Sequence, residues 1–413
     1  MIKKIKKLLL RMVYAKQPSF IMSSKYLINS SNKNIKIHRA IFFRNFKRAD
    51  LIVINLIAIV RWVGYCAWIN SYKVCKTTSK EKLPKAGLKN RFSLYLKLLK
   101  LSVINFIPPN YYFRFNLYEN DFVDFFYSKE NSILHLYSDR NFNQPKQVRN
   151  FISDKYAFLE FLEKNNLQPN YSSKTTLEKI LKDSSLLFKK CKVFCKPNVA
   201  NRSIGALCID YDSLINDYKL LTLIDKKEVL GKSNILNFIK EYYSANETIL
   251  IEKFIEDADD IKKLSQHPTD TTTMRIITAS IDGSNLLPET IYIQLEIPLL
   301  ENNNEQQFYN ILPLDIKTLD IDLTNMPDFK DKEKFEGIQI SANLKQKVST
   351  AIDMCLKVHS KLEIRAIAFD VILSPQQPII IEANYNWDIE LLYRSFRPND
   401  LHRHIAQVWL ENL

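Results

Sequence analysis

From about residue 150 to the C-terminus, apolar and polar positions change period several times, which predicts alternating strands and helices. Alternation or short apolar runs predict strands at residues 193–196, 205–210, 248–255, 274–281, 291–297, 367–373 and 378–382. Apolar residues spaced three and four apart predict helices after a cap at Ser153, at 234–243, at 342–360 and from Asp400. This order is typical of an α+β fold rather than a regular βαβ fold. Neither GxGxxG nor the P-loop motif GxxxxGK[ST] is present.

Residues 1–150 have a different pattern, which predicts a helix-rich region with irregular connections. Pro108 and Pro109 break this region before a run of aromatic residues. Gln144 and Pro145 precede the predicted helix start, so we expect a domain boundary near residue 150. The chain is therefore predicted to contain an N-terminal region of residues 1–150 and a second domain of residues 151–413.

Residues 51–68 form the longest mostly apolar run in the N-terminal region, interrupted by Asn55 and Arg61. A charge in the middle of a membrane span is costly. Three interpretations stay open: a helix buried in the protein or against a partner, a helix lying in the membrane interface, and a transmembrane helix. The apolar run at the N-terminus is too short for the core of a signal peptide.

Charge divides the chain into the same two parts. Residues 1–150 contain 28 Lys and Arg against 7 Asp and Glu, whereas residues 151–413 contain 31 Lys and Arg against 38 Asp and Glu. The N-terminal region is therefore expected to face something anionic. No nucleic-acid recognition motif accompanies the basic charge, so nucleic acid is not among the predicted partners.

The cysteines and histidines show no spacing typical of a zinc site. Cys191 and Cys195 lie four residues apart in a strand-like run and are expected to be buried, reduced thiols. This usage of cysteine favours a reducing cytoplasm.

Three candidate metal ligands lie on the last two predicted strands. Asp370, Glu382 and Asn384 are expected at the ends of these two adjacent strands, with Glu382 and Asn384 on one face and Ala383 pointing away. Carboxylate and amide oxygens are hard ligands that suit Mg²⁺. The alternative is an edge hairpin with solvated acids.

Basic and acidic side chains on the earlier strands are candidate nucleotide ligands. Lys196 ends an apolar strand, and the loop after it contains Ser203 among small and polar residues that can turn backbone N–H groups toward phosphate. Glu252 lies on another apolar strand, which ends in acids that could contact a ribose, and Arg275 lies on the next strand, where its guanidinium could bind phosphate. Taken singly, the Lys196 and Glu252 signals are more typical of ordinary structural positions, and Arg275 fits an exposed strand residue equally well.

The order of these residues, beginning with Lys155 on the first predicted helix, resembles that of the ATP-grasp superfamily over residues 150–413. The chain looks most similar to the sugar-transfer-associated ATP-grasp family, through DKYAF at 154–158, QHP at 266–268 leading into TMRIIT at 273–278, and IEANYNWD at 381–388. The resemblance implies an ATP-grasp fold, with two α+β subdomains that clasp ATP.

The resemblance also implies a role for each residue. Lys155, Lys196 and Ser203 would bind ATP; Glu252, Lys253 and Ile255 would form the hinge around the base, with an acid beyond it for the ribose; Arg275 and Lys196 would be catalytic; and Asp370, Glu382 and Asn384 would hold Mg²⁺. The sequence departs from the family at Ala368, where many members have Arg two residues before the metal-binding Asp, and in the glycine-poor loop 301–310.

The activity implied is an ATP- and Mg²⁺-dependent ligase that joins a carboxylate to an amine or amino acid through an acyl phosphate. With the basic N-terminal region, the association with sugar transfer favours a uronic acid or other carboxylate of a surface polysaccharide such as a capsule, or of its precursor. Two alternatives stay open: a ligase acting on a free small acid or peptide, and a catalytically silent nucleotide-binding scaffold of polysaccharide assembly. The expected location is cytoplasmic, with peripheral contact to the anionic inner face of the membrane.

Overall fold

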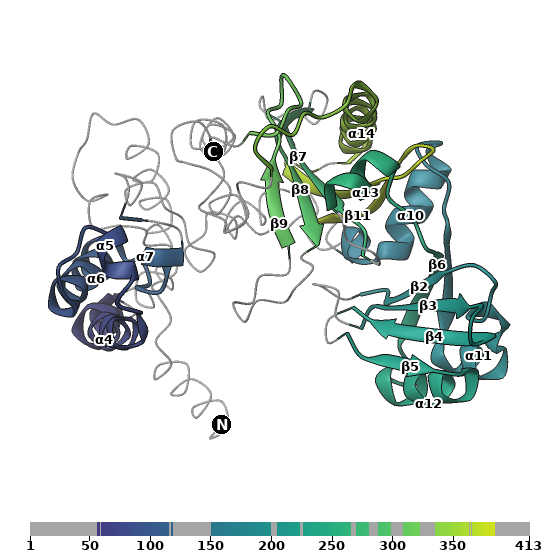
Figure 1. The fold of residues 1–413 in the computed structure, drawn as a ribbon, viewed down its shortest axis with the longest axis horizontal. Coiled ribbons are helices and arrows are strands. Elements are labelled where there is room, and N and C mark those ends of the chain that lie inside the picture. Colours follow the sequence, from purple (N-terminus) through teal and green to yellow (C-terminus); the bar gives the residue numbers. More distant parts are fainter. Residues whose placement is uncertain are drawn as a thin grey trace. The chain divides into compact units, whose positions relative to one another are not determined.

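A computed structural model describes the chain in several segments. These are residues 56–57, 59–114, 117–118, 150–199, 205–223, 226–265, 270–280, 288–298, 309–322, 335–362, 364 and 366–384. The described residues up to 118 belong to one compact unit and those from 150 onward to a second (Figure 1). The boundary predicted near residue 150 stays a prediction, because residues 119–149 lie outside the described part.

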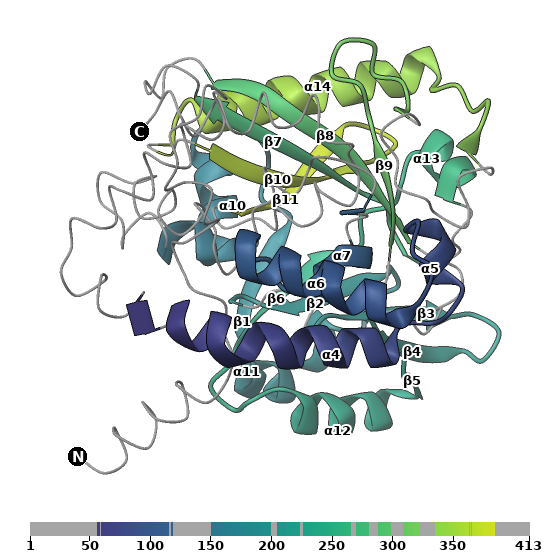
Figure 2. The same ribbon diagram turned by 90° about the vertical axis from the view of Figure 1, so that its left-hand side faces the viewer.

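The described residues of the first unit are helical. The elements are η2 (Trp62–Cys66), α4 (Ala67–Thr77), α5 (Lys82–Lys85), α6 (Arg91–Asn105) and α7 (Tyr111–Arg114). Figure 2 shows α4 and α6 side by side. The Trp62 indole N–H donates to the carbonyl of Ser102 at 2.8 Å, and the Cys75 thiol contacts the carbonyl of Arg91 at 3.1 Å. These two contacts join opposite ends of the helices, so the pair is antiparallel.

The apolar run at residues 51–68 has one packed side and one exposed side where it is described. Trp62, Cys66 and Ala67 are buried, whereas Val60, Tyr65 and Trp68 are exposed. Within the described segments, no helix combines the length and the apolar character needed to cross a membrane. All three interpretations of residues 51–68 therefore stay predictions.

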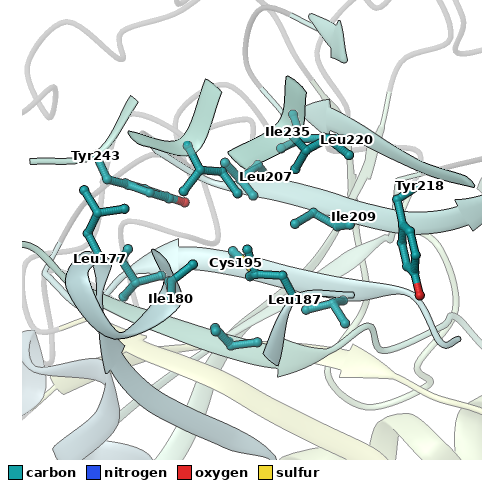
Figure 3. Packing of buried hydrophobic residues seen from close by; sticks show 14 residues of the cluster. Leu177, Ile180, Leu187, Cys195, Leu207, Ile209, Tyr218, Leu220, Ile235 and Tyr243 are labelled. Carbon is teal, nitrogen blue, oxygen red and sulfur yellow. The ribbon is translucent and has the colours of Figure 1, made fainter. Parts of the chain in front are cut away.

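The first sheet of the second unit has six antiparallel strands in the order β1-β6-β2-β3-β4-β5. The strands are β1 (Ser172–Thr176), β2 (Val193–Pro197), β3 (Leu207–Asp212), β4 (Asp217–Thr222), β5 (Glu228–Leu230) and β6 (Thr248–Lys253). Helices α11 (Leu177–Lys182) and α12 (Lys232–Tyr242) and the short η5 (Ser184–Leu186) accompany them. Apolar side chains of the described strands and helices pack into a hydrophobic core that includes Leu207, Ile235 and Tyr243 (Figure 3).

The second sheet has five antiparallel strands in the order β11-β10-β7-β8-β9. The strands are β7 (Thr273–Ser280), β8 (Pro288–Pro298), β9 (Tyr309–Pro313), β10 (Ala366–Leu373) and β11 (Pro378–Asn384). Helix α14 (Ala342–His359) packs on this sheet through a stripe of buried residues that recur every three or four positions, namely Leu344, Val348, Ala351, Cys355 and Val358. The short α13 (Asp259–Ser265) precedes β7.

Helix α10 (Lys155–Lys164) begins one residue later than the sequence suggested. Its cap is Asp154 and not the predicted Ser153, because the Asp154 carboxylate accepts the backbone N–H of Ala157 at 3.0 Å. Of the apolar residues expected on the inner face of this helix, Phe158, Leu159 and Leu162 are buried and Tyr156 is half-buried.

The predicted α+β class is confirmed, since helices and antiparallel sheets interleave along the second unit. Four short strands, β1, β4, β5 and β9, were not predicted. The prediction of two buried thiols was right for Cys195 and wrong for Cys191, which is exposed because it lies in the loop before β2. All six cysteines are free thiols. Burial raises the pKa of the Cys195 thiol well above its ordinary value, so this thiol stays protonated. The helix predicted from Asp400 lies outside the described residues.

Candidate functional site

A row of polar residues crosses four strands of the second sheet. Gln294 on β8 lies opposite Arg275 on β7, Arg275 lies opposite Asp370 on β10, and Asp370 lies opposite Glu382 on β11. Residues directly opposite each other in a sheet share a face. The four side chains, which come from distant parts of the sequence, therefore form one continuous polar line.

A β-bulge aligns the two carboxylates of this row. Val371 lies opposite Ile380, but the next residue, Asp370, lies opposite Glu382, which leaves Ile381 as the extra residue of β11. Without the bulge Glu382 would lie opposite Phe369, on the other face of the sheet. The bulge therefore brings both acids to the same side.

Arg275 is held by carboxylates on both of its neighbouring strands. Its Nε and Nη2 donate to the two oxygens of Asp370 at 2.8 and 3.1 Å, and its Nη1 lies 3.0 Å from Glu296 on β8. Gln294 donates to Glu296 in turn at 2.6 Å. Burial lowers the pKa of Arg275, but the charges of Asp370 and Glu296 outweigh it and raise the pKa, so the guanidinium stays charged.

Asp370 and Glu382 lie opposite each other but differ in acidity. Burial raises the pKa of Asp370 to about 7, against the opposing charge of Arg275. Burial also acts to raise the pKa of Glu382, but Lys155 and Lys196 outweigh it and the pKa is lowered. The Lys155 ammonium lies 3.5 Å from the Glu382 carboxylate. Glu382 is therefore the more acidic of the two.

The donor set at these strands fits a hard divalent cation. The side-chain nitrogen of Asn384 lies 3.3 Å from Asp370 and 2.9 Å from Glu382, so both carboxylates converge on one point. A turn of the amide would bring its oxygen to that point instead. In the described part of the chain, no three His, Cys, Asp or Glu side chains could hold a metal ion by themselves. Mg²⁺ suits such a site, because it commonly takes one or two carboxylates and completes its shell with water and phosphate oxygens.

Lys196 and Glu252 form a second, buried pair on the first sheet. The Lys196 ammonium lies 3.0 Å from one Glu252 oxygen, and the Ser172 hydroxyl donates to the other at 2.6 Å. Phe194, on the same strand as Lys196, lies opposite Glu252 in the sheet, so the pair bridges β2 and β6. A buried lysine needs such a partner when no ligand is bound.

The segment after β6 connects the two sheets. Of the three predicted hinge residues, Lys253 is exposed and Ile255 is half-buried, whereas Glu252 is buried. The Lys192 ammonium lies 3.8 Å from the ring centre of Phe254. The backbone N–H of Ala258 then donates to Leu373 of β10 at 2.7 Å.

Two acids follow this hinge. Asp257 is buried, its carboxylate accepts the backbone N–H of Thr272 at 2.8 Å, and burial raises its pKa to about 6. Glu256 is exposed and pairs with Lys262 at 2.8 Å. Asp257 therefore ties the hinge to the start of β7, and Glu256 is the more accessible of the two.

The structure brings most of the predicted site residues together. Contacts or charge interactions join Lys155, Lys196, Glu252, Arg275, Asp370, Glu382 and Asn384 in one cluster. Asp370 lies in the middle of β10 rather than at its end. Ser203 lies outside the described residues, as do residues 266–268 and 385–388.

The sequence reasoning missed Gln294 and Glu296. Their signal was a glutamine and a glutamate alternating with Ile293, Leu295 and Ile297 in a strand that is otherwise apolar. Buried polar residues at every second position of an apolar strand indicate a polar network.

Comparisons with known proteins give only distant similarities. No family model matches the sequence, and no curated protein matches it. Among solved structures, the chain is similar to a D-alanine–D-alanine ligase from Helicobacter pylori, with 12% identity and a TM-score of 0.36, over 63% of this chain and 58% of that one. The structure of the ATP-grasp ligase PsnB, complexed with minimal precursor, has 10% identity and a TM-score of 0.36, over 65% of this chain and 62% of that one. A RimK domain protein ATP-grasp from Sphaerobacter thermophilus has 11% identity and a TM-score of 0.34, over 64% of this chain and 69% of that one. None of these similarities assigns a function to the chain.

Proposed function

We propose that this protein is an ATP-grasp ligase, which uses ATP and Mg²⁺ to join a carboxylate to an amine. The observation that carries the proposal is the cluster in which Arg275, Asp370 and Glu382 lie in register while Lys155 and Lys196 act on Glu382. Three cations gathered around converging carboxylates suit a nucleotide triphosphate and its metal ion.

Each residue has a distinct task in the proposed reaction. Lys155 and Lys196 bind phosphate oxygens of the nucleotide, and each has a carboxylate partner in the structure that a phosphate can replace. Asp370, Glu382 and Asn384 would hold Mg²⁺. The bound metal would neutralise phosphate charge and orient the terminal phosphoryl group.

The reaction proceeds in two displacements. An oxygen of the substrate carboxylate attacks the terminal phosphorus of ATP, the bond to the ADP oxygen breaks, and an acyl phosphate forms. The amine then attacks the acyl carbon, phosphate leaves with the bonding electrons, and the nitrogen loses a proton. Arg275 has the charge and the fork geometry to stabilise the transferred phosphoryl group, with Glu296 holding it from the side opposite Asp370.

The preferred carboxylate substrate is a uronic acid or similar acid of a surface polysaccharide or its precursor. The basic N-terminal region supports an anionic carrier, and its exposed aromatic residues support peripheral contact with the inner face of the membrane. The alternative substrate is a free small acid or peptide. A silent nucleotide-binding scaffold is the alternative of another class.

Nucleotide turnover tests the proposal. The full chain is incubated with ATP, Mg²⁺ and pools of uronic acids and amines, while ADP release and new amide masses are measured. Glu382→Gln and Asp370→Asn are each expected to abolish Mg²⁺-dependent turnover and keep the fold. Glu228→Gln is the matched control, because Glu228 makes an ion pair with Lys219 on β4, away from the cluster. Wild-type turnover in either site variant would remove the metal assignment, and nucleotide binding without turnover would favour the scaffold.

A second measurement separates binding from catalysis. Lys155→Ala and Lys196→Ala are expected to weaken nucleotide binding, whereas Arg275→Ala mainly lowers the rate, because its phosphoryl contact strengthens as charge develops during transfer. Equal loss of affinity in all three variants would contradict this division of roles.

A further inference from the structure

We infer that Asn198 and Gln168 are positioning residues that fix helix α10 to both sheets and thereby set Lys155 at Glu382. The inference rests on the proposed function, because it assigns Lys155 and Glu382 to the nucleotide site. Both residues are buried and make their contacts through side-chain amides.

Asn198 fastens the first turn of α10 to the strand that carries Lys196. Its side-chain oxygen accepts the backbone N–H of Tyr156 at 2.9 Å, and its side-chain nitrogen donates to the Asp154 carboxylate at 2.9 Å. Its own backbone N–H donates to the carbonyl of Thr248 on β6 at 2.9 Å. Asn198 comes two residues after Lys196, so one asparagine links the backbones that carry both lysines.

Gln168 fastens the other end of the α10 segment to the strand that carries Glu382. After the helix, Asn166 adopts a left-handed conformation with φ of 54°, and the N–H of Leu167 donates to the carbonyl of Leu162. This turn brings Gln168 to β11. There its amide nitrogen donates to the carbonyl of Ile380 at 2.9 Å and its oxygen accepts the N–H of Ile380 at 2.7 Å.

The Gln168 side chain thus pairs with β11 as a neighbouring strand would. Ile380 immediately precedes Ile381, the extra residue of the bulge that aligns Glu382 with Asp370. An edge strand with unpaired backbone groups next to a bulge can shift its register. Satisfying both groups of Ile380 holds that register.

The two amides restrict the position of a long, flexible side chain. A lysine loses considerable rotamer freedom when it is held at one point, so a fixed backbone lowers the remaining cost of placing its ammonium at a phosphate. Loss of either amide is therefore expected to weaken nucleotide binding through Lys155, without removing any group that touches the nucleotide.

The test is a double-mutant cycle on ADP affinity, measured by calorimetry on the full chain. Asn198→Ala is expected to weaken ADP binding about tenfold in the wild-type background, as the loss of one well-placed hydrogen-bonding group does. In the Lys155→Ala background the same change is expected to have little further effect, because the group that it positions is gone. A role in general stability alone would lower affinity equally in both backgrounds, and that result would overturn the inference.

A second variant makes the test specific. The Oδ1 of Asp154 accepts both the Asn198 side-chain amide and the backbone N–H of Ala157. Asn198→Asp should therefore weaken ADP binding, because its carboxylate would face that of Asp154. Unchanged affinity in this variant would count against Asn198.

Gln168 is tested with a control from the same segment. Gln168→Leu should weaken ADP binding, whereas Asn165→Ala should not, because the Asn165 amide donates to the carbonyl of Phe161 in the same helix and does not contact β11. Unchanged affinity in Gln168→Leu would overturn its part of the inference. If the wild-type chain binds no ADP, the proposed function itself fails. If wild type binds and Lys155→Ala weakens binding while Asn198→Ala and Gln168→Leu do not, the inference alone fails.

Discussion

Replacing Arg275 should lower the free energy of unfolding of the second unit substantially. The variant Arg275→Met keeps an unbranched apolar side chain but removes the guanidinium and its charge. Three contacts would be lost, two to Asp370 and one to Glu296, and the Arg275 side chain is only 16% exposed. Removing one partner of a buried ion pair typically costs about 3–5 kcal/mol, because the other charge is left uncompensated. For a unit of this size, that cost corresponds to a fall of roughly 6–20 °C in the melting temperature.

The stability lost in Arg275→Met should increase as the pH rises. Burial raises the pKa of Asp370 to about 7, and Arg275 holds it from rising further. Without Arg275 the folded variant therefore binds more protons than the folded wild type at pH values above about 7. Linkage then requires the difference in unfolding free energy to grow as pH rises through this range. Thermal melts by circular dichroism at pH 6 and pH 8.5 measure both the cost and its direction.

An exposed ion pair provides the control for this experiment. Lys182 and Glu178 lie 2.6 Å apart on α11, but both side chains are more than 70% exposed. Lys182→Met should therefore change the unfolding free energy by less than about 0.5 kcal/mol. If Arg275→Met cost no more than this control, or if its cost grew toward low pH, the ion-pair reasoning would be refuted.

Three further predictions concern the glycine before β3, a buried histidine and the N-terminal helices. Gly205→Ala should lower the melting temperature more than Gly337→Ala. The backbone φ is +76° at Gly205 and +77° at Gly337, so both substitutions strain the backbone alike. An alanine Cβ at position 205 would also lie 2.7 Å from Pro197 Cγ, whereas one at position 337 would have no atom within 4 Å. Burial lowers the pKa of His359 to about 4, so between about pH 6.5 and pH 4 the unfolded state binds one proton that the folded state does not. The unfolding free energy should therefore fall by about 3 kcal/mol as the pH falls through this range. Urea titrations should show this fall in the wild type, and His359→Gln should remove it. Anionic vesicles should sediment the full chain, with binding that weakens in salt and persists in part through exposed aromatics such as Trp68; no binding at low salt would refute membrane contact.

The strongly patterned elements of the second unit could be predicted from the sequence. The strands that carry Lys196, Arg275 and Asp370 have apolar residues at every second position or in short runs, and all three were expected within a few residues of their observed bounds. The strand β1 could not be recognised, because its sequence from Ser172 to Thr176 contains no apolar residue. It is a strand because it pairs with β6, which is a tertiary cause and not a local one.

The chemistry of the site was predictable to the extent that it depends on residue type. A carboxylate or a lysine at the end of an apolar strand stands out in a sequence. Asn198 and Gln168 do not stand out, because an amide in a loop has no periodic signature and its partner can be anywhere. The Gln168 amide finds Ile380, 212 residues away, and only the folded backbone determines that pairing.

The position of Arg275 shows why spacing along the sequence is an incomplete guide to such sites. In the family that the sequence resembles, an arginine often precedes the metal-binding aspartate by two residues, and Ala368 occupies that position here. Side chains two residues apart on a strand share a face, and so do residues directly opposite on neighbouring strands. An arginine on β7 opposite Asp370 therefore reaches the same face as an arginine at position 368 would, although it lies 95 residues away in the chain. The same geometry makes the bulge at Ile381 necessary, because a ladder without the extra residue would turn Glu382 to the opposite face. The register of three strands, more than the spacing within any one of them, therefore assembles this site.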